Sequence, residues 1–276
     1  MKSASTTRRT SPRRLAVAVA AAAALIPALL ATPTAAAASE PPNVTGPWVS
    51  LAPVEGTGVT HDFTAAPAPR PGVSIMQQVS TDQVSLCTAS WPVISTGSHV
   101  GYLTAGHCDL IKGAPVWMYT NDQGTKKLTL SPLQNSERGV DTDGQGHDSS
   151  LFFLSQSQQD KAYGTEIADG VKLRGVMSVS DARKLRAGTP VCMNGSRSGL
   201  TCGPLIAADS DDFEWGGKAV SGDSGAPVFV VNGKGDALAI GMLQRGPTDT
   251  DNFATYLSPV LSRLGLRLIV DGEEES

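Results

Sequence analysis

The sequence contains few histidines and no apolar run long enough to span a membrane. Only four histidines occur in 276 residues, His61, His99, His107 and His147, and their spacing does not match a metalloprotease pattern such as HExxH. The long apolar run, Leu15 to Leu30, has 16 residues, whereas a membrane-spanning helix needs roughly 20. We therefore expect no metal or other cofactor and no stable membrane association.

Basic residues are also scarce outside the N-terminus. Five of the 22 Lys and Arg precede residue 39, whereas all 26 Asp and Glu follow it. Residues 39–276 thus carry a net charge of −9, which disfavours nucleic acid as a partner. The basic start, the apolar run and the small residues up to Ala38 are typical of a signal peptide over residues 1–38. We expect a secreted monomer, exported by either the Sec or the twin-arginine route.

Sustained helical periodicity is rare along the chain. Residues 39–72 are rich in Pro, Ala, Gly and Thr and lack an apolar period, which indicates a propeptide or linker. At the C-terminus, Ser258 as N-cap and Pro259 as first helical residue predict a short helix. Elsewhere short apolar runs alternate with turn residues and predict an all-β sandwich or barrel, as at 73–80, 98–104, 149–155 and 226–231.

A candidate nucleophile, Ser224, lies in the stretch GDSGAP directly before an apolar strand. Gly, Asp and Ser also favour turns for local reasons, so this stretch alone does not identify a catalytic serine. All four histidines precede Ser224 and a strand follows it, which excludes the α/β-hydrolase elbow GxSxG. The acid-first order of subtilisin belongs to an alternating α/β fold, so the order His, Asp, Ser on a β scaffold remains.

The base that would activate Ser224 is best supplied by His107, at the end of an apolar strand and beside Cys108. A bridge from Cys108 to Cys87 would hold the loop of His107 and stabilise the fold by roughly 3 kcal/mol through loop closure. Four cysteines in an exported chain suggest two disulfides, with three pairings allowed. His147 is the main competitor, because the other two histidines lie in the linker and in a turn.

Three aspartates, Asp141, Asp143 and Asp148, are candidates for the acid that orients His107. We favour Asp148 because it directly precedes the apolar strand SSLFFL and can be carried into a buried position. The other two lie in a glycine-rich turn and are expected to face water. A buried carboxylate would accept the Nδ1 proton of His107 and stabilise the imidazolium formed when Ser224 loses its proton.

The stretches TAGHC, DSSLFF and GDSGAP, in that order, resemble the three signatures of the chymotrypsin-like serine protease family. VCMNGSRSGLTCG is similar to the disulfide hairpin of the bacterial streptogrisin and α-lytic type, which implies a Cys192–Cys202 bridge. The resemblance covers about residues 73–270. It implies two packed six-stranded antiparallel β-barrels, over 73–165 and 166–276, with a short C-terminal helix.

The same resemblance implies the roles of individual residues. His107 and Asp148 would come from the first barrel and Ser224 from the second, forming the catalytic triad. The backbone N–H groups of Gly222 and Ser224 would form the oxyanion hole. Asp223, which in animal relatives binds a newly cut N-terminus, would instead have an internal partner, for which the candidates are Arg174, Arg183, Arg186 and Arg197. We expect maturation without insertion of an N-terminus.

The expected substrate pocket departs from the family pattern. Gln244 stands where a serine normally supports the buried aspartate. Lys218 stands six residues before Ser224, where trypsins carry an aspartate, so the sequence does not support a preference for Arg or Lys. We assign Lys218, Gln244, Arg245 and Gly246 to the pocket. The alternative is that the side chains of Lys218, Gln244 and Arg245 face solvent.

The sequence predicts a secreted serine endopeptidase that acts on proteins or peptides through an acyl-enzyme. Two alternatives stay open. The first is a binding protein that keeps the protease fold without catalysis, which Gln244 alone favours. The second is an acyl hydrolase that acts on esters with the same triad.

Overall fold

The computed structural model describes residues 44–53, 60–140, 146–159 and 164–271. The predicted signal peptide and the two rejected acid candidates, Asp141 and Asp143, lie outside these residues. Within them, no helix is long and apolar enough to cross a membrane.

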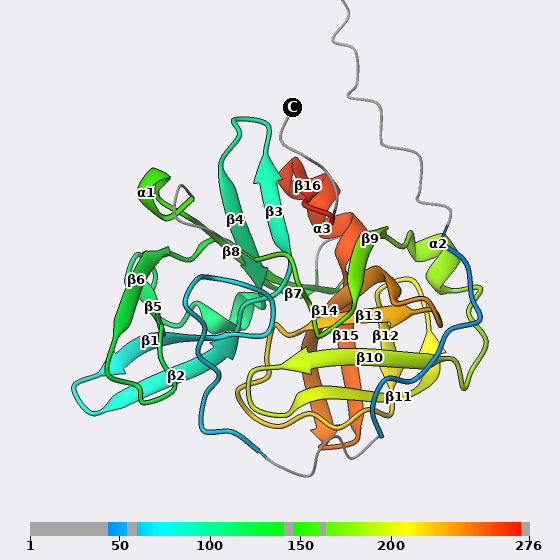
Figure 1. The fold of residues 1–276 in the computed structure, drawn as a ribbon. Coiled ribbons are helices and arrows are strands. Elements are labelled where there is room, and N and C mark those ends of the chain that lie inside the picture. The colour runs from blue at the N-terminus through cyan, green and yellow to red at the C-terminus, as the bar shows by residue number, and fades with distance from the viewer. Residues whose placement is uncertain (1–43, 54–59, 141–145, 160–163, 272–276) are drawn as a thin grey trace, which may run out of the picture. The chain divides into compact units, whose positions relative to one another are not determined.

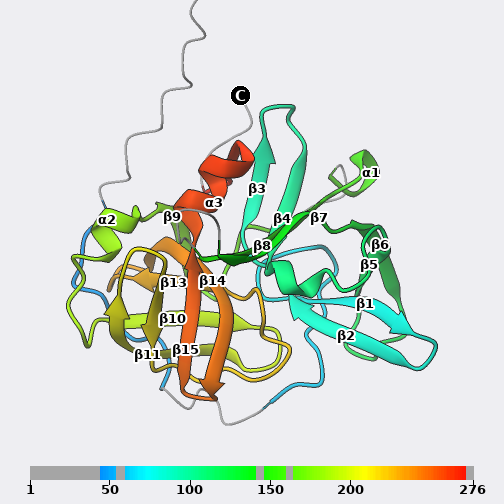
Figure 2. The same cartoon turned by 180° about the vertical axis from the view of Figure 1, so that it is seen from behind.

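The first half of the described chain forms two antiparallel sheets (Figures 1 and 2). Their interior is filled by buried side chains such as Ile75, Tyr102, Met118 and Phe152. One sheet has the order β2-β1-β5-β6 and the other has the order β16-β3-β4-β8-β7. The strands are β1 (Ser74–Ser80), β2 (Gln83–Thr88), β3 (Pro92–Ser95), β4 (Val100–Thr104), β5 (Pro115–Tyr119), β6 (Lys127–Pro132), β7 (Gln134–Val140), β8 (Gly146–Phe153) and the late β16 (Leu266–Leu268).

The second half forms a closed six-stranded barrel. Its strand order is β13-β10-β11-β12-β15-β14, and pairing of β13 with β14 closes it, while β9 adds to β14 in a parallel orientation. Phe213, Trp215 and Tyr256 pack in the interior. The strands are β9 (Lys172–Val176), β10 (Pro190–Gly195), β11 (Gly199–Ala208), β12 (Asp212–Trp215), β13 (Pro227–Val231), β14 (Asp236–Thr248) and β15 (Asp251–Tyr256).

A further hydrophobic core joins the two halves. It combines Trp91 and Leu103 from the first half with Phe229 and Leu257 from the second. The indole N–H of Trp91 crosses the interface and donates to the Gly241 carbonyl at 2.8 Å. The prediction of an all-β fold of two packed six-stranded antiparallel barrels with a short C-terminal helix is confirmed, with the closed six-stranded barrel in the second half and two further sheets in the first.

The helices are short, and only the C-terminal one exceeds four residues among those described. This helix, α3 (Leu257–Leu264), begins two residues earlier than the sequence predicted, because extended Tyr256 is the N-cap and buried Leu257 opens the helix. The chain then enters β16, which pairs with β3 of the first half. The other helices are η1 (Gly106–Cys108), α1 (Gln156–Gln159) and α2 (Val179–Ala182).

Residues 44–53 and 60–71, expected to be propeptide or linker, pack onto the strands. Trp48 bridges to Asn232, and the Val49 N–H donates to the Val231 carbonyl at 2.9 Å. The second stretch, drawn in light blue in Figure 1, crosses between the halves: the Thr64 N–H bonds to Ser74 Oγ, and the Thr64 hydroxyl donates to the Ser196 carbonyl.

Candidate active site

His107 lies in η1, directly after the fully buried strand β4. Its neighbour Cys108 is bonded to Cys87 of β2, which fixes η1 to the first sheet. A second bridge joins Cys192 to Cys202 across β10 and β11. Both disulfides named from the sequence are thus present in the structure.

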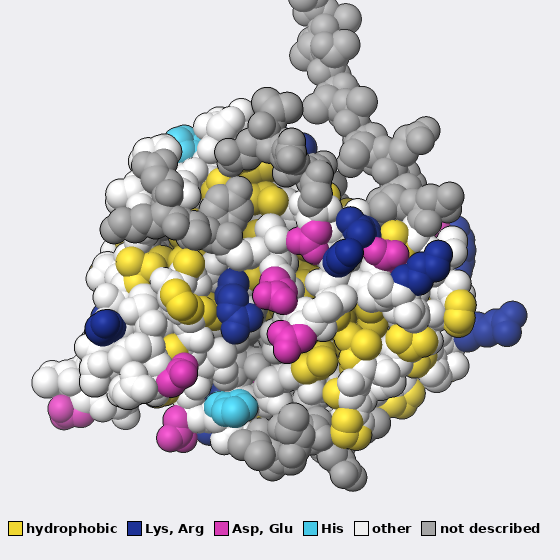
Figure 3. Space-filling model, viewed as in Figure 1, with side chains coloured by type: hydrophobic (Ala, Val, Ile, Leu, Met, Phe, Trp, Pro, Cys, Tyr) yellow, Lys and Arg dark blue, Asp and Glu magenta, His cyan; other side chains and the backbone are white. Residues whose placement is uncertain are grey.

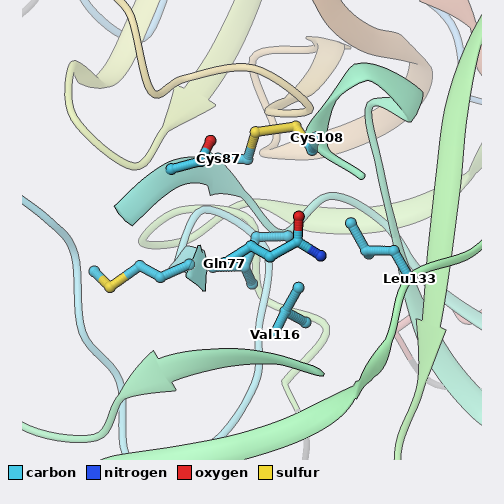
Figure 4. A pocket seen from close by; sticks show the side chains of 8 residues that line it. Gln77, Cys87, Cys108, Val116 and Leu133 are labelled. Carbon is cyan, nitrogen blue, oxygen red and sulfur yellow. A yellow bond between two sulfur atoms is a disulfide. The ribbon is translucent and has the colours of Figure 1, made fainter. Parts of the chain in front are cut away.

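Gln77, which the sequence analysis did not single out, holds the loop that follows η1. Its buried side chain accepts hydrogen bonds from the N–H groups of Leu110 and Ile111, both at 2.9 Å, and donates to the Ile111 carbonyl at 3.1 Å. Figure 4 shows Gln77 with the Cys87–Cys108 disulfide at a cavity of about 10 Å³. That volume is room for one water at most, so the cavity is structural.

Asp148 lies on β8, beside η1, and is 3% exposed. Its Oδ2 is 2.7 Å from His107 Nδ1, and its Oδ1 accepts the backbone N–H of His107 at 2.8 Å. The two bonds fix both the position and the ring of His107. A carboxylate only accepts, so Nδ1 carries the proton and Nε2 is left with a free electron pair.

Ser224 lies in the turn before β13 and packs against the strand ends that hold His107. Its carbonyl accepts the Thr88 N–H at 2.8 Å and lies 4.0 Å from Cys108 Sγ. The next residue, Gly225, has a φ of +84°, and a Cβ there would lie 2.7 Å from Ala105 N. Only glycine allows this close approach, which brings Ser224 next to η1.

The Ser224 hydroxyl is half-buried and makes no hydrogen bond to another described residue. The structure thus joins His107 to Asp148 and places the backbone of Ser224 next to η1, without a hydrogen bond between Ser224 and His107. Catalytic hydrogen bonds in free enzymes are often long and tighten when the substrate binds.

The peptide group between residues 221 and 222 is held by Arg197. The Arg197 guanidinium donates to the Ser221 carbonyl at 3.0 Å and to the His61 carbonyl at 2.9 Å. In a trans peptide the N–H points away from the C=O, so this bond also sets the direction of the Gly222 N–H. Gly222 has a φ of +103°, which residues with a Cβ rarely adopt.

The peptide group between residues 223 and 224 is held in the same way. The Asp223 carbonyl accepts the Ala226 N–H at 2.8 Å, which directs the Ser224 N–H to the opposite side. Within the described chain, the N–H groups of Gly222 and Ser224 have no hydrogen-bond acceptor. Two donors on one turn, next to a candidate nucleophile, can serve an anionic oxygen.

No family model and no curated protein matches the sequence. Among solved structures, a Nocardiopsis protease is 18% identical, covers 74% of this chain and 99% of its own, and gives a TM-score of 0.50. A glutamic-acid-specific serine protease is 16% identical, covers 72% of this chain and 100% of its own, and gives a TM-score of 0.52.

The chain has the chymotrypsin-like fold. At these identities the likeness concerns the backbone fold alone.

In this chymotrypsin-like fold, Asp223 is fully buried and its carboxylate is held by uncharged donors. Oδ1 accepts the N–H groups of Arg197 and Ser198, at 2.8 and 3.1 Å. Oδ2 accepts the Ser198 hydroxyl at 2.5 Å and the Val220 N–H at 2.8 Å. Of the four candidate arginines, Arg197 thus contributes its backbone, and the Arg174 guanidinium pairs with Asp236. Four hydrogen bonds satisfy this buried carboxylate without a newly cut N-terminus.

A cavity of about 240 Å³ opens beside Ser224. Of the four predicted pocket residues, Gln244 and Gly246 line it and Lys218 does not, while the Arg245 side chain lies outside the described part. The sequence analysis missed Asn252 and Asp249, which stand far from the motifs. The lining comprises Ala219, Val220, Ser221, Ser224, Leu243, Gln244, Gly246, Pro247, Thr248, Asp249 and Asn252.

One group of possible metal ligands occurs among the described residues, formed by Cys87, His107 and Cys108. The two cysteines are bonded to each other, so they offer no thiolate to a metal. His107 is engaged by Asp148 through Nδ1. The donor set therefore fits a disulfide beside a histidine that is bonded to Asp148.

Proposed function

We propose that the protein is a serine endopeptidase with His107, Asp148 and Ser224 as its catalytic triad. Ser224 Oγ attacks the peptide carbonyl while His107 Nε2 takes the hydroxyl proton. His107 then gives this proton to the leaving amine as the C–N bond breaks, which leaves an acyl-enzyme. Water, deprotonated by His107, then attacks the acyl carbonyl, and His107 returns this proton to Ser224 Oγ as the ester bond breaks, which releases the acid and the free serine.

The observation that carries the proposal is the double contact between Asp148 and His107. Bonds to both the backbone N–H and Nδ1 hold the imidazole in the tautomer that a general base requires. The Asp148 carboxylate also stabilises the imidazolium that forms during attack. The N–H groups of Gly222 and Ser224 would bind the oxyanion.

The proposed substrates are proteins or peptides, and the proposed location is outside the cell. Two disulfides among the described residues fit an oxidising compartment. On the face drawn in Figure 3, the described basic side chains alternate with acidic ones and form no continuous basic surface. Together with the net negative charge, this supports peptides rather than nucleic acid.

The proposal is tested by covalent labelling with a fluorophosphonate probe, with Ser224→Ala as the control. We expect stoichiometric labelling of the wild type, mapped to Ser224, and none of the variant. The labelled enzyme should also lose its activity on a mixed peptide pool. A folded wild-type protein that is neither labelled nor active would refute the proposal.

A non-catalytic binding protein is the second candidate, and the free Ser224 hydroxyl favours it. This candidate predicts peptide binding without hydrolysis and no labelling by the probe. An acyl hydrolase would be labelled but would cleave esters and leave peptides intact, so parallel ester and peptide assays separate all three.

A further inference from the structure

Asn252 is a buried amide on β15 that lines the cavity beside Ser224. The residue is 2% exposed, and its side-chain Nδ2 donates to the Gly217 carbonyl. A carbonyl oxygen accepts but cannot donate, so this bond fixes which end of the amide faces Gly217. Oδ1 is therefore the atom that faces the other way.

Oδ1 of Asn252 has no hydrogen-bond donor among the described residues. It lies against the Cα of Gly246, another cavity residue, at the place where a Cβ would stand. It is not one of the fully buried side-chain atoms that lack a partner, so it is accessible to solvent. An accessible, unpaired acceptor in the wall of a cavity beside the candidate nucleophile can accept a hydrogen bond from a substrate donor.

The charges around the cavity point to the same ligand chemistry. Asp249 is the one charged residue in its described lining, and Lys218 is not part of that lining. A carboxylate or another acceptor entering the cavity would face Asp249 and the Asn252 oxygen. An N–H donor, charged or neutral, would be attracted to both.

We propose that Asn252 determines which side chain enters this cavity, and that it selects residues ending in N–H donors, namely Lys, Arg and Gln. The inference rests on the proposed function, because the cavity then receives the residue before the scissile bond. A cavity of about 240 Å³ has room for these side chains. Asn252 acts by accepting an N–H of the substrate with Oδ1, while its bond to Gly217 holds that oxygen in place.

The cavity would discriminate between substrate side chains because a side chain without an N–H donor leaves Asn252 Oδ1 without a hydrogen bond. A leucine would exclude water from Oδ1 without replacing its hydrogen bond, and a glutamate would add repulsion. A lost hydrogen bond of this kind changes kcat/KM on the order of tenfold to a hundredfold.

The first test compares five peptides that differ only in the residue before the scissile bond: Lys, Arg, Gln, Leu and Glu. We expect kcat/KM for the three N–H donors to exceed that for Leu and Glu by about tenfold or more. A profile led by Leu or Glu overturns the inference. The affinities of the same peptides for the Ser224→Ala variant should follow the same order. This binding measurement tests the inference even if the wild-type protein does not hydrolyse peptides.

The second test compares Asn252→Leu with Asn252→Asp, which both lose the bond to Gly217. Active-site titration with the fluorophosphonate normalises for folded enzyme. Asn252→Leu should lose the advantage of Lys, Arg and Gln over Leu, whereas Asn252→Asp keeps an acceptor and should favour Lys and Arg over Gln by about tenfold. Identical effects of both variants on all five peptides would mean that Asn252 only supports the fold, and would overturn the inference.

Discussion

Both carboxylate oxygens of Asp148 form hydrogen bonds to one residue, His107. Oδ1 fixes the backbone and Oδ2 fixes the ring, so the imidazole cannot rotate without breaking a bond at a buried charge. This arrangement gives Nε2 the electron pair that would take the proton of Ser224. The acceptor at Nδ1 determines the tautomer of the neutral ring, and this tautomer leaves Nε2 able to act as a base.

Asp148→Asn therefore tests the tautomer with little change in shape. An amide N–H facing Nδ1 would turn that nitrogen into an acceptor and move the proton to Nε2. We expect kcat to fall by roughly 10⁴ while KM changes little. Steady-state kinetics measure this, with the exposed Asp122→Asn as a control expected to match the wild type. Equal activity of Asp148→Asn and wild type would exclude Asp148 as the orienting acid.

Single residues differ in how far the sequence identifies them. His107, Asp148 and Ser224 each stand in a short motif beside an apolar strand, so local sequence was enough to propose them. Asn252 and Gln77 carry no such signal, since their roles depend on contacts with Gly217 and with the loop after η1. The only sequence hint is that each is a polar residue within a segment that forms a strand.

Arg197 connects two segments that are distant in the sequence. It lies in the turn between β10 and β11, and its guanidinium joins the His61 carbonyl to the Ser221 carbonyl. The bond to Ser221 orients the peptide that carries the Gly222 N–H. In the proposed function Arg197 is thus a positioning residue for one of the two proposed oxyanion donors, and its bond to the His61 carbonyl holds the guanidinium.

Arg197→Ala should lower kcat by about tenfold with little change in KM, because the peptide of Gly222 loses its anchor while the donor itself remains. Hydrogen exchange should also become faster at residues 60–66. Steady-state kinetics measure the fall in kcat, and hydrogen-exchange mass spectrometry measures the faster exchange. Arg186→Ala, at an exposed position, is the control. Equal losses of activity and thermal stability in both variants would contradict the positioning role.

Glu214 of β12 is hydrogen-bonded to Asp251 of β15. This bond, burial and the negative charges of Asp251 and Asp212 raise the pKa of Glu214 above its usual 4.5. A raised carboxyl pKa stabilises the fold while the proton is bound. The contribution is complete below about pH 4.5 and is lost as the pH rises through the raised pKa.

Glu214→Gln should therefore unfold at a higher temperature than the wild type at pH 7, by roughly 1–3 °C, because the amide donates to Asp251 without a charge. At pH 4 the difference should vanish. Thermal melts across this range provide the measurement, with exposed Glu166→Gln as the control. A constant difference at all pH values would contradict the origin in this carboxyl pair.

Across the whole described molecule, segments near both ends of the described chain connect its two halves. The segment at Trp48 packs on the second half, the segment at Thr64 bonds to both, and β16 returns to β3. The alternation of short strands predicted the fold class because each strand has its own pattern. It did not predict these ties, since Thr64 and Ser196 are 132 residues apart.

These ties predict where the mature chain begins. Removing residues 44–71 would break the bonds at Val49, His61 and Thr64, so we expect cleavage after Ala38 and before Val44. The mass of the intact secreted protein identifies its N-terminal residue. A mature N-terminus at or beyond Gly72 would show instead that this segment is removed as a propeptide.

The central claim is that His107 and Ser224 act as one catalytic unit. The most direct test is kcat/KM of the double variant His107→Ala/Ser224→Ala beside the two single variants, on one peptide. When two residues act as one catalytic unit, replacing either one lowers the activity of the enzyme about as much as replacing both. We predict that the double variant matches each single one, and losses that multiply would contradict the account.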